Sequence, residues 1–160
     1  MRPELRLPAV AQAGAGAHTV VLDTNIVLDL FLFADPAVAA VRTLLRARRL
    51  HWLATQSMRD ELGCVLQYAH LVPRMQHYGV DAADVLGAFD AGTRLVDEAA
   101  RAPYVCKDAD DQKFIDLAVA HRAILVSKDK AVLCMRKRLL TLDTHVTAAI
   151  VFDKPVPCLG

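Results

Sequence analysis

The sequence predicts an α/β fold, an α/β/α sandwich around a mainly parallel central sheet. Short apolar and β-branched runs, such as Thr19–Leu22 and Ala123–Val126, are separated by longer segments with apolar residues at helical spacing. Strands that alternate with helices pair in parallel, because each helix carries the chain back to the same end of the sheet. The 160 residues, 54% of them hydrophobic and 23% charged, are enough to build the core of one such domain.

The domain is expected to begin with the strand Thr19–Leu22 and to span residues 18–155. Residues 1–17 are rich in alanine and glycine and lack the leucine-type apolar centre of a signal peptide. We therefore expect a flexible N-terminal leader over residues 1–17. Residues 156–160 are expected to be a short C-terminal tail.

Three helices and a strand are predicted next along the chain. The mostly apolar segment Ile26–Phe33 is expected to be helical. Asp35-Pro36 is typical of an N-cap followed by proline at the first helical position, and it opens a second helix. His51–Ala54 reads as a strand, after which Thr55 or Ser57 is expected to cap a further helix.

The second half of the chain carries one strong helical pattern. Asp108–His121 has apolar residues on one face and acidic residues at its start. A helix over Asp81–Ala91 is expected to stop at the glycine that follows, and Thr147–Phe152 is expected to be a last strand. Leu71–Val80 and Leu95–Val105 show no regular pattern, and a short extended piece is the expectation for the second of them.

Composition excludes several classes of protein. Lys and Arg number 19 against 18 Asp and Glu, so the net charge of +1 argues against a binder that works through overall basicity. No apolar run reaches the 18 or so residues that span a bilayer. The four cysteines form no CxxC pair, which favours reduced thiols over disulfides or a zinc site. We expect a soluble, cytoplasmic protein.

Four acidic residues are predicted to converge at one edge of the sheet. Asp23 and Asp129 each follow a strand, and Glu61 and Asp111 lie in the early turns of helices that start at the same edge. Carboxylates packed together repel one another unless a cation neutralises them. Mg²⁺ and Mn²⁺ prefer such oxygen ligands, and can activate water for hydrolysis of a phosphodiester.

Each of these acids also has a purely structural interpretation. Asp23 would close a strand-to-helix turn, and Glu61 would place a favourable charge near a helix N-terminus. Asp111 would belong to a capping arrangement in which Asp108 is the N-cap. Asp129 would pair with a neighbouring lysine. Only convergence in space separates the two interpretations.

Other charged residues are assigned to the surface. Asp116 lies well round the helix from Asp111 and is expected on a solvated face, and Asp29 is expected either there or buried beside the site. The basic runs Arg46–Arg49 and Met135–Arg138 are typical of solvated helix faces. If they flanked the acidic edge, they would hold an RNA backbone.

Two motifs flank the predicted acidic site. Val20–Asn25 is a strand followed by Asp-Thr-Asn, and Leu125–Asp129 is a strand ending in Ser-Lys-Asp. With these motifs the chain resembles the PIN domain family, and in particular its subgroup of VapC-like toxin components of toxin–antitoxin systems. Asp111–Ala118 and Glu61 complete the resemblance. Serine at position 127, where threonine is commoner, keeps the hydroxyl.

The resemblance implies a Mg²⁺- or Mn²⁺-dependent endoribonuclease that dimerises and is held inactive by an antitoxin protein. The implied metal-binding and catalytic acids are Asp23, Glu61, Asp111 and Asp129, and the implied supporting residues are Thr24, Asn25 and Ser127. The segment Met135–Gly160 is longer than the usual closing strand, which leaves C-terminal contacts undefined.

Two alternative functions stay open from the sequence. A haloacid-dehalogenase-like phosphatase also places an aspartate after the first strand, but it usually needs a second aspartate two positions on, where this chain has Asn25. A PIN-like RNA-binding or scaffold module without activity would be expected if the acidic set were degraded, yet all four acids are present.

Overall fold

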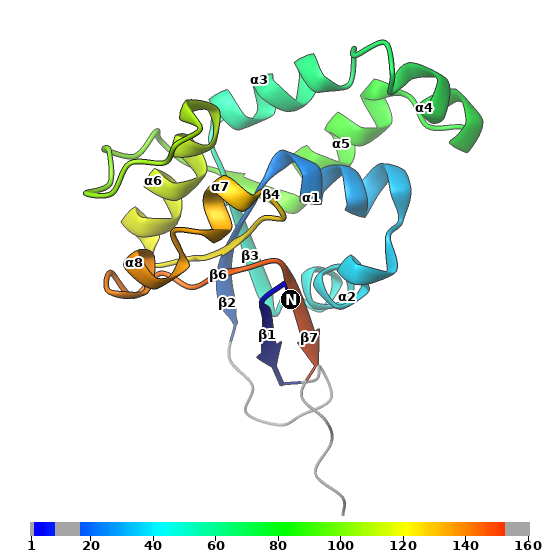
Figure 1. The fold of residues 1–160 in the computed structure, drawn as a ribbon. Coiled ribbons are helices and arrows are strands. Elements are labelled where there is room, and N and C mark those ends of the chain that lie inside the picture. Colours follow the sequence, from blue (N-terminus) through cyan, green and yellow to red (C-terminus); the bar gives the residue numbers. More distant parts are fainter. Residues whose placement is uncertain (1, 9–16, 153–160) are drawn as a thin grey trace, which may run out of the picture.

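A five-stranded parallel sheet forms the centre of the molecule in the computed structural model, which describes residues 2–8 and 17–152 (Figure 1). The strand order is β4-β3-β2-β5-β6, and every neighbouring pair is parallel. These strands are β2 (His18–Leu22), β3 (Leu50–Ala54), β4 (Thr93–Leu95), β5 (Ile124–Val126) and β6 (Val146–Thr147). The predicted α/β fold with a mainly parallel sheet is confirmed.

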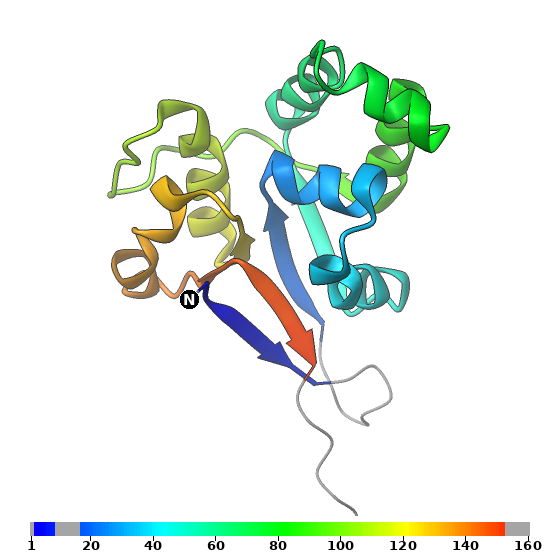
Figure 2. The same cartoon turned by 45° about the vertical axis from the view of Figure 1, so that its right-hand side comes forward.

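Helices lie on both sides of the sheet (Figures 1 and 2). One group comes from the chain between β2 and β4. It consists of α1 (Thr24–Leu28) and α2 (Ala39–Arg46), which precede β3, and of α3 (Gln56–Val65), α4 (Val72–Tyr78) and α5 (Ala82–Gly92), which follow it. The other group is α6 (Gln112–His121), α7 (Lys130–Leu133) and α8 (Arg136–Leu140). Short turns complete the set: a π-helical turn at Asp29–Phe33 and 3₁₀ turns at Pro36–Val38 and Ala109–Asp111.

The expected N-terminal leader contains a strand, which corrects that prediction in part. β1 (Glu4–Leu7) pairs in parallel with β7 (Ala149–Phe152) in a separate two-stranded sheet. Glu-Leu-Arg-Leu alternates polar and apolar residues, the period of a half-buried strand, and Leu7 is buried. This alternation predicts a strand at Glu4–Leu7. Residue 1, the Ala/Gly-rich part at 9–16 and the tail at 153–160 lie outside the described residues.

The irregular segment Leu71–Val80 forms a helix, α4. Pro73 and Gly79, which make the sequence pattern irregular, lie at the two ends of the helix and do not interrupt it. Pro73 lies in the first turn, where proline has no helical hydrogen bond to lose, and Gly79 ends the helix with a left-handed φ of 66°. By contrast, β4 begins at Thr93, before the segment expected to be extended, and the chain from 96 to 105 has no helix or strand.

Local capping follows the sequence closely. The carboxylate of Asp35 accepts a hydrogen bond from the Ala37 amide at 2.9 Å, with Pro36 opening the turn. Thr55 is the N-cap residue of α3, although its side chain makes no capping hydrogen bond. Buried apolar side chains of α6, such as Phe114 and Leu117, cover β2 and β5. This packing fixes the ends of the two central strands next to the start of α6.

Among the described helices, none by itself is long and apolar enough to cross a membrane. The bent pair Thr24–Phe33 and Pro36–Arg46 meets the criteria of length and composition only when its two parts are taken together across a bend of 109°.

Candidate metal centre

Two central strands end side by side and bring the first two predicted acids to one edge. Asp23 directly follows β2, and its backbone amide donates to the carbonyl of Val126 at the end of β5, at 3.0 Å. Asp129 lies three residues beyond Val126. Because β2 and β5 are neighbouring parallel strands, both acids face the same edge of the sheet.

Asp23 is held by a buried serine. The hydroxyl of Ser127 donates to Oδ2 of Asp23 at 2.7 Å and accepts from the Asp129 amide at 3.1 Å. Burial raises the pKa of Asp23, the hydrogen bond from Ser127 opposes the rise, and the charges of Glu61 and Asp129 add to it. The serine therefore connects the two loops and supports the ionised form of Asp23.

Glu61 reaches the site from α3 and has two partners there. Thr24 donates its hydroxyl to Oε2 of Glu61 at 2.5 Å, and Nζ of Lys113 lies 3.0 Å from Oε1. Glu61 is the sixth residue of α3, beyond the first turn, so a stabilising charge at the helix N-terminus does not account for it. Lys113 was not among the predicted site residues.

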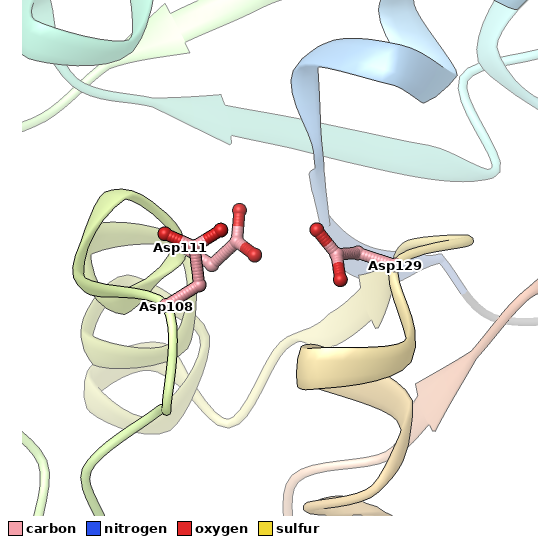
Figure 3. Close-up of side chains that lie close together, drawn as sticks. All are labelled: Asp108, Asp111 and Asp129. Carbon is pink, nitrogen blue, oxygen red and sulfur yellow. The ribbon is translucent and has the colours of Figure 1, made fainter.

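Three aspartates form the densest group of acids, which we call the acidic cluster: Asp108, Asp111 and Asp129. One carboxylate oxygen from each lies within 4.8 Å of the others. Figure 3 shows Asp108 and Asp111 on one side, from the turn that precedes α6, and Asp129 facing them from the start of α7. The spacing of three residues between Asp108 and Asp111 in a helical turn places both on one side. That spacing was the signal for Asp108, which had been assigned only a capping role.

Capping and clustering coexist in two of these residues. Asp108 accepts from the Asp110 amide at 3.0 Å, which confirms the predicted N-cap. Asp129 accepts from the Ala131 amide at 2.9 Å and caps α7, so its structural role is capping and the expected pairing with a neighbouring lysine is wrong. Among the described residues, Lys128 instead forms an ion pair with Asp29.

Asp111 carries a buried carboxylate oxygen within the acidic cluster. Its side chain is almost fully buried, and within the described part of the chain Oδ2 has no hydrogen-bond partner. Burial raises the pKa of Asp111 to about 8, and the nearby Asp129 and Asp23 contribute. An unpaired buried carboxylate oxygen in an all-oxygen group of ligands fits a hard divalent cation such as Mg²⁺ or Mn²⁺.

A pocket of about 370 Å³ joins the acids into one site. Asp23, Glu61 and Asp111 line it together, and Asp129 adjoins it through Asp111. Exposed Asn25 lies at the same pocket. The four predicted acids therefore lie at one edge of the sheet, as the metal-site interpretation predicts.

Two other acids have structural roles. Asp116 is not on a solvated face, because its Oδ1 accepts from the Ala102 amide and from the side chain of Gln112, both at 2.8 Å. This contact ties the 96–105 segment to α6, a packing that helical spacing alone does not reveal. Asp29 is buried and opens the π-helical turn beside Lys128.

The cysteines described by the structure are free thiols at Cys64, Cys106 and Cys134. Cys158 lies outside the described residues. The one group of three potential metal-ligating side chains found among residues 2–8 and 17–152 is the acidic cluster, which contains no cysteine.

Comparison with known families identifies the family of this chain. The PIN domain model matches residues 19–131, a range that includes Asp23, Glu61, Asp108, Asp111 and Asp129. The chain belongs to the PIN domain family. The PIN family membership argues against the haloacid-dehalogenase alternative. Asn25 agrees with this, because a haloacid-dehalogenase-like phosphatase usually has a second aspartate at that position.

The fold of this PIN domain is also seen in a solved structure, VapBC2 from Rickettsia felis bound to a DNA fragment from their promoter. The TM-score is 0.54 at 14% sequence identity, and the match covers 81% of this chain and 98% of the other. No curated protein matches the chain.

Proposed function

We propose that this PIN domain is a Mg²⁺- or Mn²⁺-dependent endoribonuclease that acts as the toxin of a toxin–antitoxin pair. The observation that carries the proposal is the buried oxygen of Asp111, which has no hydrogen-bond partner among the described residues and belongs to a side chain grouped with Asp108 and Asp129. No hydrogen bond within residues 2–8 and 17–152 compensates this oxygen, and a divalent cation would compensate it.

A divalent cation held there would stabilise the negative charge that develops on a phosphodiester during hydrolysis. Asp111, Asp129 and Asp23 would be the principal ligands, and Asp108 would add a further oxygen from the same turn. Ser127 keeps Asp23 oriented and favours its ionised form. Thr24 and Lys113 hold Glu61 in place, which fixes its carboxylate at the rim of the pocket.

The supporting residues would divide the remaining work. Asn25, exposed beside the pocket, would donate its side-chain amide to a phosphate oxygen of the RNA. Thr24 would act through Glu61, and Ser127 through Asp23, without touching the substrate.

The toxin role is supported by the fold shared with a VapB–VapC assembly. A free nuclease of this kind would harm its own cell, and a dedicated antitoxin protein would restrain it. A homodimer is also part of the proposal, because the VapC-like subgroup that the sequence resembles is dimeric.

The decisive experiment is a cleavage assay on single-stranded and structured RNA. The wild-type chain is expected to cut with Mn²⁺ or Mg²⁺ and to stop cutting in EDTA. Asp23→Asn is expected to lower the rate at least about a hundredfold, because it removes a ligand charge. Asp90→Asn serves as the matched control, since it removes an equal charge from an exposed pair with Arg59.

Two results would contradict the proposal. Cleavage that survives both EDTA and Asp23→Asn would mean that the activity comes from elsewhere. Tight RNA binding without turnover under any divalent metal would favour the alternative of a catalytically inactive RNA-binding module.

A further inference from the structure

A second, oppositely charged surface adjoins the acidic site. A hollow of about 750 Å³, which we call the basic groove, is lined by Arg2, Pro3, Lys128, Lys130, Leu133, Cys134, Arg136 and Lys137. Five of these residues are cationic and none is acidic. The groove therefore offers a concave, strongly positive surface.

Little in the described structure neutralises this charge. Among residues 2–8 and 17–152 the ion pairs are Arg59 with Asp90, Lys113 with Glu61 and Lys128 with Asp29. Lys128 is therefore the groove cation that pairs with a carboxylate in this part of the chain. Like charges gathered in one concavity repel each other unless an anion binds between them, which points to an anionic ligand.

The tertiary fold places this groove directly beside the metal centre. Lys128 and Lys130 flank Asp129, whose carboxylate faces the acidic cluster. Arg2 reaches the groove because the carbonyl of Pro3 accepts hydrogen bonds from the Ala148 amide and the Thr147 hydroxyl, both at 3.0 Å. α7 and α8 contribute the remaining cations.

Most of the groove lies outside the residues shared with the PIN family. The family model ends at residue 131, so only Lys128 and Lys130 fall within its range of 19–131. Arg2, Arg136 and Lys137 come from the N-terminal segment and α8, which the match does not cover. Most of the groove lining therefore lies beyond the residues that the family model matches.

We propose that the basic groove binds the sugar–phosphate backbone of single-stranded RNA and guides it to the acidic site. This inference rests on the proposed ribonuclease function and adds a path for the substrate. Five cations that line one groove suit a repeating phosphate chain. Five of the eight lining residues are cationic, and this excess of positive charge favours a polyanion as the ligand.

The test measures binding separately from cleavage. Fluorescence anisotropy of a labelled single-stranded RNA would be recorded in EDTA over a range of salt concentrations. The groove variant is Arg136→Gln/Lys137→Gln, two exposed residues of one helix. The control is Arg46→Gln/Arg94→Gln, which removes the same charge at α2 and at β4, on the opposite edge of the sheet from β6.

The groove variant is expected to bind RNA about tenfold more weakly than wild type, and the control is expected to bind normally. Each lost phosphate contact lowers the salt dependence of log K by about 0.7 on a single strand, so two contacts predict a loss of about 1.4. Urea unfolding checks that both variants fold. If the groove variant fails to fold, Arg2→Gln/Lys130→Gln takes its place.

The outcomes separate this inference from the proposed function. Weakened binding by the groove variant supports the groove even if the wild-type chain cuts no RNA. Unchanged binding overturns it even if cleavage is robust, and would leave a partner protein as the ligand of this surface. An equal loss in groove variant and control also overturns it, because charge alone would then explain the effect.

Discussion

Asp23 and Asp111 are aspartates at the same edge of the sheet, exposed by only 4% and 7%, yet their surroundings differ. Oδ2 of Asp23 accepts a hydrogen bond from Ser127, whereas Oδ2 of Asp111 has no partner among the described residues. The pKa of both carboxyls is raised by burial, but only at Asp23 does a hydrogen bond oppose the rise. Both carboxylates are buried, but only that of Asp23 has a hydrogen bond that compensates its burial among the described residues.

This difference shows which part of the site the protein completes by itself. An unsatisfied buried polar group costs about 1–3 kcal/mol, and more when it is charged. Ser127, Thr24 and Lys113 compensate Asp23 and Glu61 with groups from the chain. Oδ2 of Asp111 has no such partner in the described part of the chain, so we expect a bound cation to stabilise this carboxylate the most.

The largest effect is expected for Asp111→Asn, which removes the uncompensated carboxylate. Cleavage is expected to fall at least about a hundredfold, because a cation ligand is lost. In EDTA, however, the variant should be about 1–3 kcal/mol more stable than wild type at pH 8, because it no longer buries an unpaired carboxylate. Urea unfolding with and without Mn²⁺ measures both the gain in EDTA and the loss of stabilisation by metal.

The control is Asp116→Asn, in α6, the helix that begins directly after Asp111. It removes an equal charge from an acid that has two hydrogen-bond donors. It should not raise stability in EDTA, and it should keep the stabilisation by Mn²⁺. A destabilised Asp111→Asn protein would show that the carboxylate is compensated after all.

The second largest effect concerns pH. The folded pKa of Asp111 is raised from 3.8 to about 8, so the folded state holds a proton that the unfolded state has released between these values. Its stabilising contribution is fully present below pH about 3.8 and is lost as pH rises through about 8. In EDTA the free energy of unfolding is expected to fall over this window.

Saturating Mn²⁺ or the Asp111→Asn substitution should flatten that pH dependence. Titration calorimetry in buffers of different ionisation enthalpy should also detect proton release when metal binds at pH 7. A stability profile in EDTA that is the same for wild type and Asp111→Asn would contradict the assignment.

Ser127→Ala would make Asp23 resemble Asp111. The change removes the hydrogen bond to Oδ2 and is expected to raise the pKa of Asp23 further, since that bond now opposes the effect of burial. Stability at neutral pH should fall by about 1–3 kcal/mol. NMR titration of the carboxyl carbons and urea unfolding measure the two effects, and Ser57→Ala, at a less buried hydroxyl, is the control. An unchanged pKa of Asp23 would count against the role of the serine.

The smallest effect is expected for Lys113→Gln. The ion pair with Glu61 is partly exposed, at 23% and 27%, and Thr24 still donates to the same carboxylate. The free energy of unfolding should therefore change by under about 1 kcal/mol. Arg59→Gln, in the exposed pair with Asp90, is the control. A loss well above that of Arg59→Gln in urea unfolding would place Glu61 with Asp111 among the poorly compensated acids.

Most of the helices and strands could be predicted from the sequence, and so could the acids that follow the two central strands. Period-two and helical patterns encode which face of a short segment is apolar, and caps such as Asp35 and Asp108 act within three residues. Asp23 and Asp129 were therefore predictable as residues that follow neighbouring strands. Even the overlooked strand at Glu4–Leu7 carried its alternation in the sequence.

Tertiary structure alone decided how each acid is compensated. Ser127 lies 104 positions from Asp23 and Lys113 lies 52 from Glu61, and no local pattern specifies such pairs. The unpartnered oxygen of Asp111 and the meeting of Arg2 with α8 likewise arise from packing. The physical reason is range: backbone preference and periodicity act over a few residues, whereas charge compensation depends on which distant segments the folded core brings together.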